Sequence, residues 1–495
     1  MKALGTVTMY YRFLDSDSRD TLDLVMDKSV NFREFVVSLG KHVDSAEVSL
    51  SLAHIAAVFA WELREVETIE RIAGCSFGSE PVVRPWTFPF RTRSDRISTA
   101  HLIDDAVEFS LSTNPEEWIK AELLLLKSYV LLETPQGSLA LEDVKQLVAS
   151  NPDLSCFNSY IHHIDARIRY SEGNLANALP ICETGLDLAT KTGNLYQAVW
   201  LHRWLGMMTM NTEPKLAIAQ FEQAYQIAKG LGSQFHTEAV LTEMGWVSII
   251  LGEYDLAIAF YDEARQLASS QDSLSDRHSL VLSNVCSDLG DGPQALDWAE
   301  WALEWHLIHG SEGDSWTHLA LARALILLDR LEEASKHLDA AREMAFRSGQ
   351  EREIAFYYLV SGLYETASGN PRESINILQN ALEICERTNT QMYLNRCVFA
   401  LACAEMELFK LEGGDETNDS TGHWMEYLEE LAHSRNLPGL LIQHSLLKAE
   451  LQKYQNRYED ARSTLIDALT IYDSPGVKSL QNQVLEKIRE IDTRL

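Results

Sequence analysis

The stretch EMGWVSIILGEYDLAIAFYDEA, residues 243–264, contains the spacing that decides the fold. Gly245 and Gly252 are seven residues apart, and Ala257 and Ala264 repeat that interval further along. A single continuous helix gains nothing from two glycines, which favour a turn instead. Two helices that pack closely against each other, in contrast, need small residues where they meet. We therefore interpret the stretch as a helix, a short turn and a second helix.

The same interval between small residues recurs along most of the chain. The pairs are Ala178 and Gly185, Ala217 and Ala224, Ala257 and Ala264, Ala295 and Ala302, Ala334 and Ala341, Ser374 and Ala381, and Ala461 and Ala468. Their first members are separated by 39, 40, 38, 39, 40 and 87 residues, so the last interval holds two repeats, one of them enlarged. A fixed period of this length is typical of a helical solenoid.

These positions resemble the tetratricopeptide repeat (TPR) family, whose pattern has a small residue in the first helix, glycine in the turn, and alanine, an apolar residue and alanine in the second. The matching residues are Gly245, Gly252, Ala257, Tyr261 and Ala264 in one copy and Gly362, Gly369, Ser374, Leu378 and Ala381 in another. The resemblance covers about residues 155–475. It implies an all-α fold, a right-handed α-solenoid of about eight TPR-like hairpins with a short helical N-terminal region. The period is nearer 39 residues than the family's usual ~34, which predicts longer helices.

The chain divides into a helical N-terminal region with its connector, residues 1–94, and the solenoid, residues 95–495. The connector contains glycine and proline and cannot form one regular helix. Residues 114–152 predict a degenerate repeat whose second helix begins near Ser138. Residues 412–423 form an acidic insertion and predict an exposed loop. The N-terminal region is expected to cap the solenoid, with a separate docking domain as the alternative.

Composition limits the classes of partner. The chain has 42 basic and 73 acidic residues, a formal net charge of −31, which disfavours binding to nucleic acid or to anionic membranes. Seven dispersed cysteines without a Cys-x-x-Cys pair are typical of reduced thiols. No apolar run reaches the ~20 residues of a membrane span, and the beginning of the chain has no secretory pattern. We expect a cytoplasmic protein.

The resemblance also implies that the first helix of each repeat lines a concave groove. Carried over repeat by repeat, the groove residues are Tyr160, His163, Arg167, Trp200, Arg203, Trp246, Arg277, Asn284, Trp316, Arg323 and Phe356. Arginine and aromatic side chains suit an acidic or aromatic peptide segment. The alternative is that several of them belong to the core between repeats, or that the arginines only neutralise nearby acids. Chaperone-binding TPR proteins use a Lys and Asn clamp at groove positions to hold a C-terminal carboxylate. His163 and Arg167 stand at the equivalent positions here and do not match the clamp, which disfavours a co-chaperone role.

Other patterns favour structural roles. Trp298, Trp301 and Trp305 form a stripe at helical spacing, which predicts packing against the next repeat rather than a binding platform. The segment RPWTFPFRTRSDR, residues 84–96, is expected to fold back on the acidic solenoid, with docking of an acidic partner as the alternative. In HHID, residues 162–165, His163 and Asp165 are two positions apart and point to different helix faces, and no second cluster at ligand spacing accompanies them, so we expect no metal site. No nucleotide-binding or hydrolase motif is present, so we expect neither a cofactor nor an enzymatic activity.

The sequence thus predicts a non-enzymatic scaffold or adaptor that binds a protein or peptide in the concave groove of a TPR superhelix. The alternative is a peptide- or ligand-sensing regulatory protein whose repeats switch a signalling or transcription partner. An assembly of identical chains is compatible with either.

Overall fold

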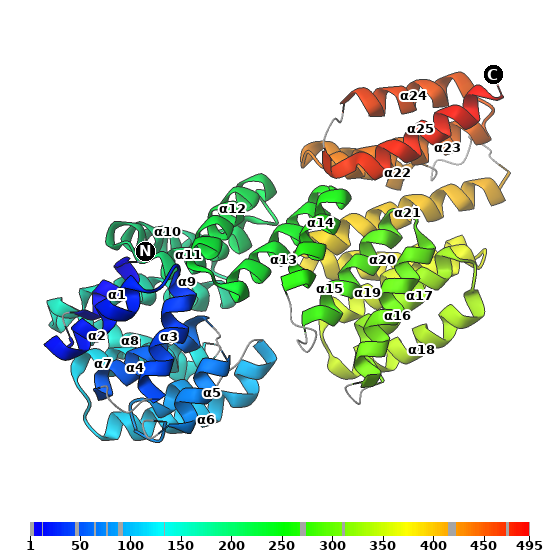
Figure 1. Ribbon diagram of the computed structural model, residues 1–495. Coiled ribbons are helices and arrows are strands. Elements are labelled where there is room, and N and C mark those ends of the chain that lie inside the picture. The colour runs from blue at the N-terminus through cyan, green and yellow to red at the C-terminus, as the bar shows by residue number, and fades with distance from the viewer. Residues whose placement is uncertain are drawn as a thin grey trace. The chain divides into compact units, whose positions relative to one another are not determined.

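The computed structural model describes the chain as helices joined by short connections. The residues described are 4–11, 13–44, 49–63, 66–75, 78–87, 93–132, 134–267, 274–308, 312–413, 422–471 and 475–494, and no strand occurs among them. Contacts divide the chain into two compact units, Met1–Val240 and Leu241–Leu495, called here the N-terminal and the C-terminal unit. Figure 1 shows the helices that make up the two units.

The N-terminal unit begins with short helices and continues into hairpins. Its elements are α1 (Leu4–Tyr11), α2 (Ser16–Asp27), α3 (Phe32–Asp44), α4 (Leu50–Leu63), α5 (Val66–Gly74), η1 (Arg84–Thr87), α6 (Arg93–Ser112), α7 (Glu117–Val130), α8 (Pro135–Ser150), η2 (Pro152–Phe157), α9 (Asn158–Ser171), α10 (Leu175–Thr192), α11 (Leu195–Thr209) and α12 (Pro214–Leu231). The residues of α13 (Gln234–Leu251) lie on both sides of the division.

The C-terminal unit continues the alternation of first and second helices. Its elements are α14 (Tyr254–Leu267), α15 (Leu274–Asp288), α16 (Gly292–Ile308), α17 (Ser315–Leu327), α18 (Leu331–Ser348), α19 (Glu351–Ala367), α20 (Pro371–Arg387), α21 (Gln391–Leu411), α22 (His423–Ser434), α23 (Pro438–Tyr454), α24 (Tyr458–Ile471), η3 (Pro475–Val477) and α25 (Lys478–Asp492). The predicted repeats correspond to the pairs from α9–α10 to α23–α24, which confirms the TPR-like all-α solenoid.

Small residues in the first helix of a repeat receive a bulky side chain from the second. A Cβ atom on Gly245 would lie 2.5 Å from the Tyr261 ring, and one on Gly362 would lie 2.4 Å from Cγ of Leu378. Tyr261 and Leu378 are completely buried. The recurring glycines and alanines are therefore the positions where the two helices of each hairpin approach closely, because a larger side chain would force them apart.

The degenerate repeat predicted over residues 114–152 is the hairpin of α7 and α8. The expected start of its second helix near Ser138 was wrong by three residues, because Pro135 occupies the first turn of α8 and the Thr134 hydroxyl accepts a hydrogen bond from the Gly137 N–H at 3.3 Å. Proline at this position has no N–H to leave unpaired, and threonine is a common N-cap. Most of the acidic insertion, residues 414–421, lies outside the described residues, as do connector residues 88–92.

Within the N-terminal unit, the helices before α6 pack against the first helices of the earliest repeats. The Tyr10 hydroxyl of α1 donates a hydrogen bond to Glu122 of α7, and His54 of α4 lies 3.5 Å from the same carboxylate. The rings of Trp61 in α4 and Tyr129 in α7 pack edge to face, 5.7 Å apart. These helices therefore lie against the repeats within one compact unit. The boundary predicted at residue 94 remains a prediction.

Candidate functional site

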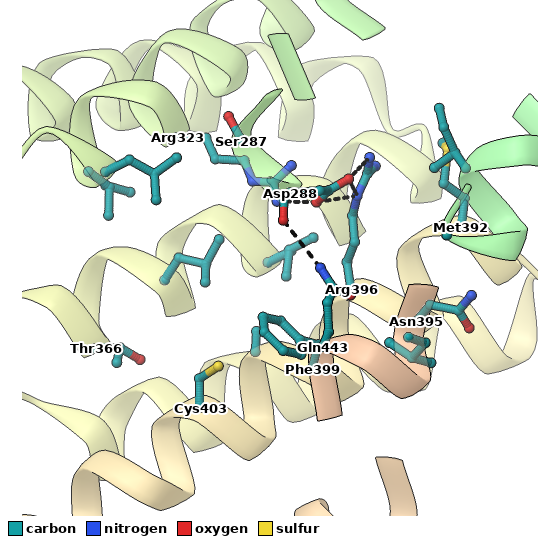
Figure 2. A pocket seen from close by; sticks show the side chains of 18 of the residues that line it. Ser287, Asp288, Arg323, Thr366, Met392, Asn395, Arg396, Phe399, Cys403 and Gln443 are labelled. Atoms are coloured by element: carbon teal, nitrogen blue, oxygen red, sulfur yellow. Dashed lines mark hydrogen bonds and ion pairs between the residues drawn. The ribbon is translucent and has the colours of Figure 1, made fainter. Parts of the chain in front are cut away.

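The C-terminal unit encloses a cavity of about 650 Å³, a size typical of ligand-binding sites. Nearly all its lining residues come from the first helices of successive repeats, namely α13, α15, α17, α19, α21 and α23. Figure 2 shows this cavity from close by. The first helices of successive repeats in this unit therefore surround a common interior.

Aliphatic and aromatic side chains form most of the cavity wall. Phe399, Ala400, Cys403 and Met406 follow one another on α21, and Leu359 lies on α19. Residues spaced three and four apart share one face of a helix, so the α21 residues present a continuous apolar strip to the cavity. Burial raises the pKa of the Cys403 thiol to about 12, which keeps it in its neutral form. The body of the cavity therefore suits an apolar group.

One end of the cavity is polar, because three charged side chains from three helices meet there (Figure 2). Asp288 is the last residue of α15, Arg323 belongs to α17 and Arg396 to α21. Arg396 donates through Nε to both Asp288 carboxylate oxygens, at 3.0 and 2.9 Å, and through Nη2 at 2.5 Å. Arg323 donates to the same carboxylate through Nη2. We call these residues the Arg–Asp–Arg cluster.

The cluster is buried, and its charges do not cancel. Asp288 is 4% exposed, and the two arginine side chains are 8% and 9% exposed. Burial alone raises the pKa of Asp288, but the guanidinium groups of Arg323 and Arg396 outweigh it and hold that pKa below the usual value. The carboxylate is therefore ionised at neutral pH, and two positive charges surround one negative charge.

Two amide side chains complete the polar end. Gln443 of α23 donates through Nε2 to the Asp288 main-chain oxygen at 3.2 Å, and its Oε1 accepts from the Tyr254 hydroxyl at 3.5 Å. Asn395 of α21 donates through Nδ2 to the Ile250 main-chain oxygen at 3.1 Å. Its Oδ1 is buried and has no hydrogen-bond donor among the described residues. Buried acceptors are normally paired, so this atom is available to a ligand N–H.

The first and last repeats of the C-terminal unit are in contact and close the ring of helices around the cavity. We call this contact the seam. Main-chain atoms of Gly252 and Gly439 meet so closely that a Cβ atom on Gly252 would lie 2.7 Å from Cα of Gly439. Asp255 accepts hydrogen bonds from the Ser479 N–H at 3.0 Å and from its hydroxyl at 2.5 Å. Gln483 donates to the Leu289 main-chain oxygen at 2.6 Å.

The groove residues predicted in the C-terminal half occupy different environments. Arg323 lines the cavity, and its Nη1 donates to the Asn284 main-chain and side-chain oxygens at 3.1 and 3.2 Å. Trp316 stacks on the completely buried Phe356, with ring centroids 5.5 Å apart. Trp246 packs against the buried core of the unit, and Arg277 is exposed on α15.

The predicted residues of the N-terminal unit are largely buried. Tyr160, His163 and Trp200 line a second, smaller cavity together with Trp61 and Trp86 from the N-terminal helices. Burial, followed by the positive charge of Arg167, holds the pKa of His163 well below its usual value. Arg167 lies over the rings of Tyr129 and Trp204, at 4.5 and 4.7 Å, and Arg203 lies 4.7 Å from the Trp200 ring. A role in partner binding remains a prediction for all these residues.

Sequence reasoning missed Asp288, Arg396, Asn395 and Gln443. Asn395 and Arg396 lie on α21, in the enlarged seventh repeat. That repeat lacks the pair of small residues from which the groove positions of the other repeats were assigned. Asp288 is joined to Arg396 across 108 positions of the chain, so no local pattern connects them. The one available signal was that the first helix of the seventh repeat contains an arginine, Arg396, as the first helices of several earlier repeats do.

Three of the remaining expectations can be compared with the described residues. Trp298 packs against the core clusters, Trp301 is 37% exposed, and Trp305 is half-buried with a buried Nε1 atom, so the tryptophan stripe is only partly core. Among the described residues no set of three histidine, cysteine, aspartate or glutamate side chains is arranged to hold a metal ion. None of the described helices combines the length and the apolar character needed to cross a bilayer.

Comparisons with known proteins found similarity to solved structures alone: no family model and no curated protein matches the chain. The apo quorum sensor NprR from B. thuringiensis is 16% identical, with 68% of this chain and 97% of that chain covered and a TM-score of 0.48. The Rap conjugation gene regulator of the plasmid pLS20, solved with the Phr* peptide, is 16% identical over 76% and 98% of the chains, with a TM-score of 0.45.

A Rap protein complexed with competence and sporulation factor is 15% identical over 76% of this chain and 98% of that chain, with a TM-score of 0.39. Similarity at this level carries no information about a ligand. The hairpins, their period and the small residues between paired helices are features of the chain itself. They make it a TPR-like repeat protein.

Proposed function

We propose that this chain is a non-catalytic binding protein that holds a peptide segment in the cavity of its C-terminal unit. The single observation that carries the proposal is the cavity itself, about 650 Å³, surrounded by the first helices of successive repeats and provided with the Arg–Asp–Arg cluster at one end. Ligand sites are typically concave, mostly apolar and equipped with a few convergent polar groups. This cavity has all three properties.

The seam favours a ligand-sensing protein over an open scaffold. Hydrogen bonds from Gln443, Ser479 and Gln483 join the last helices of the unit to its first repeats. A ligand that enters through the seam has to separate these elements, so binding and the conformation of the unit are linked. An adaptor with a permanently open groove needs no such contact. The sensing role is therefore a more specific form of the proposed binding function, and it uses the same cavity.

The test is to block the cavity without disturbing the surface. Ala400 of α21 lines the cavity and is 2% exposed, whereas Leu411 at the end of the same helix is 66% exposed. Ala400→Trp places an indole in the cavity, and Leu411→Trp adds the same group outside it. Binding of short synthetic peptides to the full chain is measured by fluorescence anisotropy, after circular dichroism has shown equal helix content.

The expected result is that peptides bind the wild type and Leu411→Trp with the same affinity and Ala400→Trp at least tenfold more weakly. Equal binding to all three proteins would place the peptide elsewhere on the chain and end the assignment to this cavity. Entry through the seam is examined separately by hydrogen exchange in α25, which should change on peptide binding if the protein is a sensor.

A further inference from the structure

The polar end of the cavity has the electrostatic character of an anion site. Two guanidinium groups and one carboxylate leave one positive charge there, and all three groups are at least nine-tenths buried. The described hydrogen bonds of Arg396 use Nε and Nη2, so the two N–H groups of Nη1 are available to a ligand. A guanidinium group is well suited to a carboxylate because its fork of donors matches the two oxygens.

The other charged residue of the lining lies at the far end of the cavity. Glu407 is eleven positions beyond Arg396 on α21, about 16 Å along the helix axis. It accepts a hydrogen bond from Lys410 at 2.7 Å, so a cation already offsets its charge. The strip of Phe399, Ala400 and Met406 lies between the two ends. The cavity is therefore polar and positive at one end and apolar along its length.

We propose that the cavity recognises a carboxylate carried at the end of an aliphatic chain, with the carboxylate on Arg396 and Arg323 and the chain along α21. This inference rests on the proposed function, because it specifies the ligand of the same cavity. The shared chemistry has two sources, the C-terminus of a peptide with aliphatic last residues and a long-chain fatty acid. The experiment below separates them.

Asn395 provides an independent observation that points to a ligand. Its side chain lines the cavity, is 8% exposed, and has in Oδ1 an acceptor without a donor among the described residues. Asn395 precedes Arg396 on α21, and Figure 2 shows both side chains at the cavity. The amide N–H of a peptide's last residue can donate to this oxygen, while a fatty acid has no such donor. The peptide C-terminus satisfies more of the site.

The probes are matched pairs that differ in the carboxylate. A short peptide ending in Leu-Ile is compared with the same peptide as its C-terminal amide, and dodecanoic acid is compared with dodecanol. Affinity for the full chain is measured by isothermal titration calorimetry. The expected result is that each acid binds at least tenfold more tightly than its uncharged counterpart, and that the peptide acid binds more tightly than the fatty acid.

Two variants change the charge of the polar end in opposite directions. Arg396→Met lowers it to zero and should weaken the acids tenfold or more while leaving the amide unaffected. Asp288→Asn raises it to two positive charges and should increase the affinity of each acid relative to its uncharged counterpart, a ratio that the loss of stability alone does not change. Arg347→Met is the control, since Arg347 is exposed on α18 and paired with Glu343. A loss of folding would weaken binding of an acid and of its uncharged counterpart alike. It therefore cannot change their relative affinity in opposite directions in the two variants.

Each outcome decides between the two proposals. Equal binding of the peptide acid and its amide would overturn the carboxylate inference and leave peptide binding in place. Binding of dodecanoic acid without the peptide acid would support the carboxylate inference and overturn the peptide as ligand. If neither acid binds, the carboxylate inference is overturned. The proposed function is then decided separately, by comparing peptide binding to the wild type, Ala400→Trp and Leu411→Trp.

Discussion

The seam can be tested by adding one methyl group to it. Gly252 and Gly369 stand in equivalent turns of two repeats and share a left-handed backbone, with φ of 74° and 81°. A Cβ atom on Gly369 meets nothing within 4 Å, whereas one on Gly252 lies 2.7 Å from Cα of Gly439. The variants Gly252→Ala and Gly369→Ala therefore have the same conformational cost and differ in the seam alone.

The magnitude follows from these distances. Placing alanine in the left-handed region costs about 1–2 kcal/mol in either variant. In Gly252→Ala the main chain at Gly439 must also move by about 0.7 Å, from 2.7 Å to an ordinary contact near 3.4 Å. Overpacking of this kind costs about 1–3 kcal/mol. We therefore expect Gly252→Ala to destabilise the seam by about 1–3 kcal/mol more than Gly369→Ala does.

The assay is amide hydrogen exchange of the full chain, read by mass spectrometry. In α25, whose Ser479 and Gln483 form seam hydrogen bonds, Gly252→Ala should accelerate exchange about 5- to 100-fold relative to Gly369→Ala, since about 1.4 kcal/mol corresponds to a factor of ten. Gly369→Ala should affect α19 and α20 and leave α25 at the wild-type rate. Equal exchange of α25 in the two variants would refute the reasoning that the glycine contact holds the ring closed.

Three further predictions concern packing, pH and charge. Gly245→Ala should lower the free energy of unfolding by about 1–3 kcal/mol, because the added Cβ atom meets the Tyr261 ring. Gly230→Ala, whose Cβ atom meets nothing within 4 Å, should raise it by about 0.5–1 kcal/mol. Both changes are measured by urea titration. Burial lowers the pKa of His278 to about 4 in the folded chain against about 6.5 unfolded, so this residue's contribution to stability should fall by roughly 3 kcal/mol between pH 6.5 and 4. Urea titrations across that range should therefore show a smaller loss of stability in His278→Gln than in the wild type, by about that amount. Asp288→Asn should destabilise the helices around the cavity by about 3–5 kcal/mol, because it leaves two buried guanidinium groups without their carboxylate. The change is measured as the rate of local hydrogen exchange in those helices, and an unchanged rate would contradict the burial of the cluster.

The sequence was sufficient for the fold because the packing residues repeat. Gly245 and Gly362 each receive a bulky side chain from the second helix of the same hairpin, so one geometric requirement recurs at nearly the same interval. A requirement that recurs can be recognised within one sequence, without knowing what any single repeat does. The same regularity explains why the repeat pattern carried little information about function, since every residue in it serves packing.

The site could not be predicted in the same way because its residues occur once. Asp288, Arg323 and Arg396 come from three repeats and meet only when the four repeats from α15–α16 to α21–α22 have been stacked, and the distances between them in the chain follow no pattern. Arg323 was among the predicted groove residues because its repeat carries the usual small residues. Arg396 was not, since the enlarged repeat offers no small-residue pair from which to count.

Net charge is informative about the surface of this protein and misleading about its cavity. A chain of formal charge −31 repels anions at long range, and this justified the expectation that phosphate backbones and anionic membranes are poor partners. Exposed charges are screened beyond a Debye length of about 8–10 Å, however, while buried charges interact strongly at short range. The Arg–Asp–Arg cluster therefore presents a positive group to whatever occupies the cavity, despite the acidic surface. We therefore expect an acidic exterior with a positive interior to disfavour polyanions and still to admit the proposed ligand with a single carboxylate. Such a ligand would meet weak repulsion on approach and two guanidinium groups in the cavity.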